Sequence, residues 1–150
     1  MSELSDLYQE VILDHSRHPH NYHAMADASR KAEGYNPLCG DTVTVYLKLD
    51  GDKIQDASFE GHGCAISKSS ASIMTDLVKG KSSTEAAALF EKFRLMVTGE
   101  AKVAADPTDK LTVFSGVSEF PTRVKCAVLG WHTLRSALEN KAAKVSTESI

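Results

Sequence analysis

The sequence contains few cysteines and no long apolar stretch. Three cysteines among 150 residues cannot close a framework of disulfides, and no apolar run approaches the roughly 18 residues that a membrane-spanning helix needs. The first ten residues are acidic rather than basic, which excludes the pattern of a secretory signal peptide. We therefore expect a cytoplasmic protein with reduced thiols and no membrane partner.

The chain also lacks an excess of charge of one sign. Seventeen basic and twenty acidic residues give a net charge of −3, and no basic stripe is present, so we expect no nucleic-acid partner. An apolar fraction of 42% and a charged fraction of 25% are typical of globular proteins. The length predicts one domain, residues 1–150, with an ordered core over about residues 4–140 and a polar, frayed tail over 141–150.

Alternating apolar residues predict a β-hairpin. Residues 42–49 place valines and leucines on one face, and Asp50-Gly51 is a typical hairpin turn before a second strand over residues 53–60. In that second strand Ile54 and Phe59 fall on opposite faces, so we predict a β-bulge between them.

Helical periodicity predominates outside the hairpin. It predicts helices over about residues 4–14, 66–78, 82–98, 110–117 and 121–138. The second long helix begins with Ser82 and Glu85 at the spacing of a capping box. With a short strand near residues 29–33, the predicted fold is α+β, a small antiparallel sheet of about three strands with helices packed on one face.

Four histidines gather in one segment, residues 15–23. Pro19 and Asn21 lie in the same segment and predict a loop rather than a helix. Because histidines that are separated by a proline cannot line one face of a helix, we interpret this segment as a solvated loop and not as a set of metal ligands.

The cysteines and one aspartate form the main candidate site. Cys39 and Asp41 precede the first hairpin strand, and in an extended chain both side chains point toward the face that meets the helices. Cys64 opens a helix, where the helix dipole favours a thiolate. Cys126 lies about 130° from the centre of the apolar stripe of the last helix, given 3.6 residues per turn. That position predicts a thiol on the shoulder of the helix, beside Arg123.

These four side chains form a donor set with a chemical preference. Three thiolates and one carboxylate suit tetrahedral coordination of Zn²⁺. Their spacing, however, is not that of paired CxxC motifs. The spacing alone therefore leaves open whether the cysteines bind a metal, act as nucleophiles or fill the core.

Three longer motifs make the sequence similar to a known family. They are NPLCGD at residues 36–41, GHGCAIS at 61–67 and RVKCA at 123–127. In this order they resemble the cysteine motifs of the IscU/SufU family of iron–sulfur cluster assembly proteins, which includes NifU-like N-terminal domains. Lys125 stands where the IscU branch typically has a histidine, and the segment between the second and third motifs is longer than in IscU. The sequence therefore looks more like the SufU branch.

The resemblance implies a SufU/IscU-like fold and a specific chemistry. It implies Zn²⁺ bound by Cys39, Asp41, Cys64 and Cys126, with Cys39 accepting sulfur from the persulfide of a SufS-like cysteine desulfurase. Such a protein is sulfurtransferase-like and passes sulfur on toward a cluster scaffold or recipient apo-proteins. We expect Arg123 to offset the negative charge of the thiolates.

Three other functions are compatible with the same residues. The four ligands also suit iron or a transient [2Fe–2S] cluster on a scaffold that hands the cluster to apo-proteins. A structural zinc module is a second alternative, although structural sites usually have four Cys or His ligands. A thiol enzyme that uses His62 and Cys64 is a third, but the sequence offers no third residue to orient the histidine.

Overall fold

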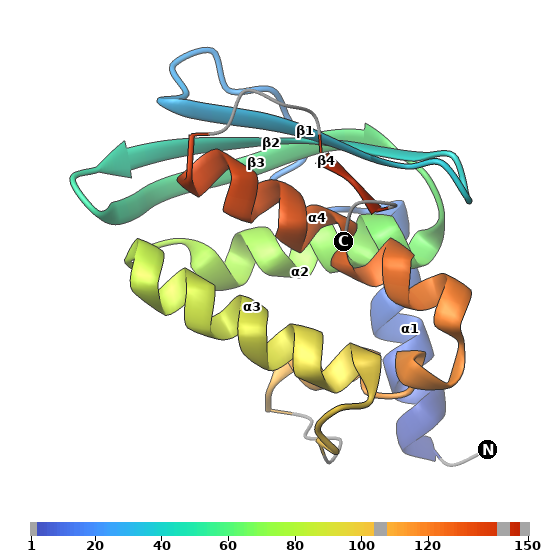
Figure 1. The fold of residues 1–150 in the computed structure, drawn as a ribbon. Helices are drawn as coiled ribbons and strands as arrows, with labels where there is room; N and C mark the ends of the chain where they lie inside the picture. The colour runs from blue at the N-terminus through green and yellow to red at the C-terminus, as the bar shows by residue number, and fades with distance from the viewer. Residues whose placement is uncertain (1–2, 104–107, 141–144, 148–150) are drawn as a thin grey trace.

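The computed structural model describes residues 3–103, 108–140 and 145–147. Four long helices, four strands and two short 3₁₀ turns alternate along these residues (Figure 1). In chain order they are α1 (Glu3–Arg17), β1 (Arg30–Asn36), β2 (Asp41–Asp50), β3 (Lys53–His62), α2 (Ala65–Val78), α3 (Ser83–Thr98), η1 (Lys110–Phe114), η2 (Val117–Glu119), α4 (Pro121–Leu138) and β4 (Val145–Ser146). No helix among the described residues is long and apolar enough to cross a membrane.

The sheet has the strand order β3-β2-β1-β4, in which the first three strands are antiparallel. The predicted bulge is present: Lys48 pairs with Asp56 and Leu49 pairs with Ile54, so Gln55 is the extra residue. This bulge returns Ile54 to the face of Phe59, and both side chains are buried. The predicted small antiparallel sheet is therefore confirmed, with the short parallel strand β4 added at one edge.

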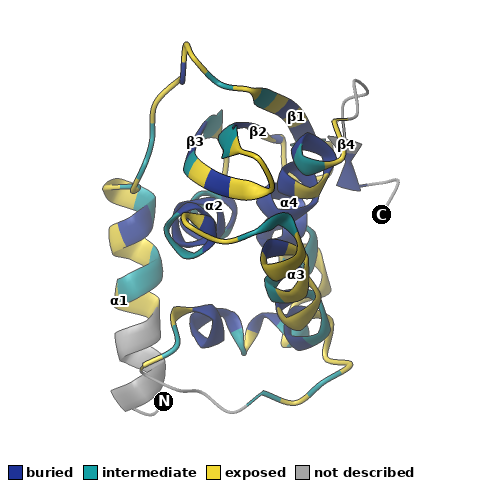
Figure 2. Ribbon diagram, turned by 90° about the vertical axis from the view of Figure 1, so that its left-hand side faces the viewer, coloured by how far each residue is buried: buried dark blue, intermediate teal, exposed yellow. Residues whose placement is uncertain are grey.

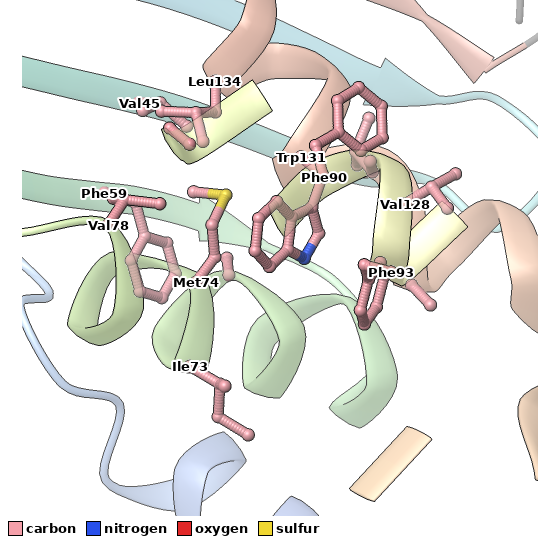
Figure 3. Close-up of a cluster of buried hydrophobic side chains, with 14 of the residues drawn as sticks. Val45, Phe59, Ile73, Met74, Val78, Phe90, Phe93, Val128, Trp131 and Leu134 are labelled. Carbon is pink, nitrogen blue, oxygen red and sulfur yellow. The ribbon is translucent and has the colours of Figure 1, made fainter. Parts of the chain in front are cut away.

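The helices cover one face of the sheet, as predicted (Figure 1). α2 and α4 contact the sheet directly, and α3 packs on α4 (Figure 2). Figure 3 shows the centre of this core, where the Trp131 ring stacks on Phe93 at 5.1 Å and on Phe90 at 6.2 Å between ring centroids. Apolar side chains that alternate along β2, such as Val45, complete the same core.

The caps of the helices follow the sequence closely. Ser82 and Glu85 form the predicted capping box, in which each side chain accepts a hydrogen bond from the backbone N–H of the other residue. Gly99 ends α3 in the left-handed conformation, with a φ of 81°. These caps fix the bounds of α3, whereas the segment predicted as one short helix over residues 110–117 forms the two turns η1 and η2.

The histidine segment differs from the prediction. α1 continues to Arg17, and His15 is 4% exposed, with its Nδ1 2.7 Å from the Ser72 hydroxyl of α2. His20 Nδ1 lies 2.5 Å from an Asp76 oxygen. The interpretation as a solvated loop is therefore wrong for His15, which is buried in α1 against α2. His20 does lie in an exposed turn, and its contact with Asp76 ties that turn to α2.

The expectation of a frayed C-terminal tail is also wrong for part of that tail. Residues 145–146 pair with β1 in parallel, and Thr147 is 1% exposed. Residues 141–144 and 148–150 of the predicted tail lie outside the described residues. A two-residue strand is too short to give a periodic sequence signal, and its partner strand supplies the hydrogen bonds that the sequence pattern does not reveal.

Candidate metal centre

The three cysteines and Asp41 meet at one end of the sheet. Cys39 lies in the turn that joins β1 to β2, Asp41 is the first residue of β2, Cys64 is the N-cap of α2, and Cys126 is in the second turn of α4. The β1–β2 turn and the starts of α2 and α4 lie together at the right-hand end of the molecule in Figure 1. The extended conformation expected at Cys39 is absent, because residues 37–40 form a turn.

The distances between the side chains define a compact donor group. One ligand atom from each of Cys39, Asp41 and Cys126 lies within 4.8 Å of the others. Cys39 Sγ and Cys126 Sγ are 3.5 Å apart. Cys64 lies outside this group, but its Sγ is 3.9 Å from Asp41 Oδ2. All four residues that the sequence singled out are therefore brought together, and the group within the described residues contains no histidine.

Asp41 is fully buried, with both carboxylate oxygens hydrogen-bonded. The Cys64 N–H donates to Oδ1 at 2.8 Å, and Asn36 Nδ2 donates to Oδ2 at 3.4 Å. Gly63 makes this arrangement possible, since a Cβ at that position would lie 2.3 Å from Asp41 Oδ1. The second glycine of the GHGC motif therefore leaves space for the Asp41 carboxylate.

Cys64 has an acidic thiol. Its pKa falls from 9.0 to about 6, mainly because the Cys126 thiol donates a hydrogen bond to it, with further help from the N–H groups of Ser67 and Ile66. Burial acts in the opposite direction, because it disfavours the charged form. The Ser67 N–H lies 3.5 Å from the sulfur, so the thiolate caps the start of α2.

Cys126 is fully buried, which corrects the prediction that its thiol lies at the side of the helix, away from the apolar stripe. Residues 126–134 of α4 are all buried, because the helix lies between the sheet on one side and α2 and α3 on the other. A helix enclosed on all sides has no single apolar stripe from which an angle can be measured. The hydrogen bond to Cys64 and burial raise the pKa of Cys126, so a proton at this pair stays on Cys126 in the metal-free protein.

Arg123 lies one turn before Cys126 on α4 and is exposed. Interaction with the cysteine sulfurs, first with Cys64, then with Cys126 and Cys39, raises the pKa of its guanidinium. The predicted proximity of this cation to the sulfurs is therefore present. His62, in contrast, is exposed and is not part of the donor group.

One polar residue at the site was not singled out from the sequence. Asn36, the last residue of β1, is fully buried and donates from Nδ2 to Asp41 Oδ2 and, at 3.5 Å, to Cys126 Sγ. The one sequence signal for Asn36 was its position at the start of the NPLCGD motif. Asparagine before a proline is typical of an ordinary turn, so this signal did not indicate a role at the site.

Comparisons with known proteins identify a family for this chain. The model of the NifU-like N-terminal domain family matches residues 7–148. The chain belongs to this family. Family members that resemble it include the iron–sulfur cluster assembly scaffold protein IscU of Streptococcus pyogenes, 42% identical over 95% of this chain and 89% of the relative. The zinc-dependent sulfurtransferase SufU of Bacillus subtilis is 41% identical over 95% of this chain and 94% of the relative.

A solved structure within the family has the same fold. It is the crystal structure of a proposed iron–sulfur cluster assembly scaffold protein for the SUF system from Fervidobacterium islandicum. The two chains superpose with a TM-score of 0.79 at 39% identity, over 86% of this chain and 94% of the other. The predicted family and its fold are therefore confirmed.

Proposed function

We propose that this chain is an iron–sulfur cluster assembly protein that accepts persulfide sulfur on Cys39, at a zinc centre formed with Asp41, Cys64 and Cys126. One observation carries the proposal. The exposed Cys39 sulfur, on a turn, lies 3.5 Å from the buried Cys126 sulfur, in a group completed by the Asp41 carboxylate. The donor set fits a soft divalent ion, because thiolates with one carboxylate match the preferences of Zn²⁺.

The four residues differ in exposure and in how firmly the fold holds them, which suggests that they have different roles. Asp41 and Cys126 are fully buried, and Cys64 is fixed as the N-cap of α2. Cys39 alone is exposed, on a turn that begins after Pro37, so it is the sulfur that a partner can reach. Bound zinc supplies positive charge that keeps these thiols deprotonated at neutral pH. Cys39 is therefore available as a nucleophilic thiolate on the surface.

The transfer itself balances without an oxidant. The Cys39 thiolate attacks the outer sulfur of a cysteine persulfide on a cysteine desulfurase, and the S–S bond of that persulfide breaks. The donor cysteine leaves as a thiolate, and Cys39 becomes the new persulfide. The exposed guanidinium of Arg123 offsets negative charge near the sulfurs. The sulfur would then pass to a cluster scaffold or a recipient apo-protein, and the reducing cytoplasm suits the three free thiols.

A sulfur-transfer assay tests the role of Cys39. The zinc-loaded chain is incubated with a SufS-like cysteine desulfurase and ³⁵S-labelled cysteine, and the label retained on the chain is measured. We expect Cys39→Ser to lose the label and His62→Gln, a change at an exposed neighbour of the Cys64 turn, to retain it. Full labelling of Cys39→Ser would overturn the proposal.

Metal analysis tests the ligand set separately. We expect zinc in the protein as purified, and weaker zinc retention in Asp41→Ala, because the substitution removes the one charged oxygen ligand. Unchanged zinc affinity in this variant would remove Asp41 from the ligand set. A stable iron–sulfur chromophore in the purified protein, without zinc, would instead support the scaffold function named for the Streptococcus pyogenes relative.

A further inference from the structure

Asn36 lies between the thiol site and the C-terminal strand. Its side chain is fully buried and makes four hydrogen bonds. On the amino side, Nδ2 donates to Asp41 Oδ2 at 3.4 Å and to Cys126 Sγ at 3.5 Å. On the carbonyl side, Oδ1 accepts from the Leu38 N–H at 3.2 Å and from the Thr147 hydroxyl at 3.0 Å.

The partners determine the orientation of the Asn36 amide. The Leu38 N–H is a donor only, so the atom that faces it and the Thr147 hydroxyl must be the carbonyl oxygen. Asp41 and Cys126, when ionised, are acceptors only, so the opposite side must be the amino group. A rotated amide would place its oxygen against the carboxylate and leave the Leu38 N–H without a partner. The two donors on the Oδ1 side therefore hold the amino group toward the site.

Thr147 comes from a distant part of the sequence. It follows β4, which pairs in parallel with β1 through Gly34 and Tyr35, and its side chain is 1% exposed. Its bond to Asn36 joins residues 111 positions apart and is shorter than the other three bonds of the amide. The C-terminal segment is therefore connected to the site through one buried side chain.

We propose that Asn36 is a positioning residue for the metal centre and that the Thr147 hydroxyl holds it in place. Through this bond, residues 145–147 control how tightly the metal is retained. This inference rests on the metal centre of the proposed function. It concerns residues that are not ligands themselves. Groups that hydrogen-bond to ligands fix the orientation of those ligands, and losing such a group typically costs 10–100-fold in metal affinity.

The Asn36 amide acts on two ligands at once. Asp41 Oδ1 is already held by the Cys64 N–H, so the bond to Oδ2 fixes the rotation of the carboxylate. The same amino group approaches Cys126 Sγ and stabilises its thiolate form. Loss of the Thr147 hydroxyl leaves Asn36 Oδ1 with one partner instead of two, which loosens the amide and both of these ligands together.

The test uses four threonine variants of the full chain, three of them at Thr147. Thr147→Val removes the hydroxyl at nearly constant volume, and Thr147→Ser restores it. Thr133→Val is the matched control, because Thr133 is also fully buried but donates to Leu129 O within its own helix. Zinc affinity is measured by competition with a chromophoric chelator, and the absorption bands of the Co²⁺-substituted proteins report ligand geometry.

We expect about tenfold weaker zinc binding and shifted Co²⁺ bands in Thr147→Val, at the low end of the range for groups that orient ligands. Thr147→Ser and Thr133→Val should bind zinc as the unmodified chain does. Thr147→Ala removes the same hydroxyl if valine prevents folding. Unchanged zinc affinity and Co²⁺ bands in both hydroxyl-free variants would overturn the inference, as would an equal loss in Thr133→Val. Failure of the unmodified chain to bind zinc would instead overturn the proposed function.

Discussion

The core beneath the sheet and the thiol site at its end are held together in different ways. In the core, Trp131 and Phe93 stack inside a dense apolar cluster, even though Trp131 Nε1 has no hydrogen-bond partner among the described residues. At the site, a few polar contacts of 2.8–3.9 Å join Asp41 and Cys126 to groups from other segments. Packing therefore stabilises the fold, whereas a small number of polar contacts positions the candidate metal ligands.

A substitution in the core should have the largest effect on stability. We expect Trp131→Ala to lower the free energy of unfolding by about 3–5 kcal/mol, because a fully buried aromatic ring is replaced by a cavity. Urea denaturation of the metal-free protein measures the change. Phe120→Ala is the control, since Phe120 is 59% exposed and its loss should change the free energy by less than about 0.5 kcal/mol. Equal losses in the two variants would contradict the contrast between packed and exposed rings.

A substitution next to Asp41 should damage the site while leaving the core packed. We expect Gly63→Ala to weaken zinc binding about 10–100-fold, because its methyl group would displace the Asp41 carboxylate from the Cys64 N–H. Gly116→Ala serves as the control, since a Cβ there meets no atom within 4 Å. Chelator competition measures both affinities. Normal zinc binding in Gly63→Ala would show that zinc affinity does not depend on the position of the Asp41 carboxylate.

The acidity of Cys64 gives the site a pH dependence in the neutral and weakly alkaline range. In the metal-free protein, we expect thiolate absorbance near 240 nm to show one step with a midpoint at about pH 6 that disappears in Cys64→Ser. Because the folded pKa lies below the unfolded value of 9.0, the free energy of unfolding should rise as the pH increases from about 6 to 9. A first thiol that titrates near pH 9 would contradict the hydrogen bonding described for Cys64.

A buried histidine in the core should produce a smaller effect at acid pH. Burial, with the charges of Arg135 and Arg94, lowers the pKa of His132 to about 4. The unfolded chain binds this proton near pH 6.5 and the folded chain does not, so the free energy of unfolding should fall between pH 6.5 and 4. We expect a contribution of about 2 kcal/mol at pH 5, since that pH lies about 1.5 units below the unfolded pKa and the side chain is buried. His132→Gln should flatten this slope, and His23→Gln, at an exposed position, should leave it unchanged.

Local signals in the sequence predicted much of the fold. The bulge at Gln55 followed from two apolar residues on opposite faces, and the capping box at Ser82 followed from a four-residue pattern. Both features depend on neighbours in the chain. His15 was wrongly predicted to lie in a solvated loop, because its buried partner Ser72 is 57 positions away and gives no local signal in the sequence.

The residues of the site were predicted, but the contacts that hold them in position were not. The thiols and Asp41 are chemically distinctive, so their positions pointed to a shared ion. The burial of Cys126 depends on how α4 is enclosed, and the role of Asn36 depends on contacts with Asp41 and Thr147. A pattern of residues carries no information about such contacts until the fold brings them together.

The order of the site residues along the chain has a consequence for how the protein is made. Cys39, Asp41 and Cys64 precede α4, Cys126 lies within it, and Thr147 follows it. A nascent chain on the ribosome therefore exposes two of the thiols long before the helix that carries the third has emerged. The complete donor group therefore forms only after α4 has been made, and a translation product that stops short of α4 would carry two thiols that lack the third and are open to oxidation.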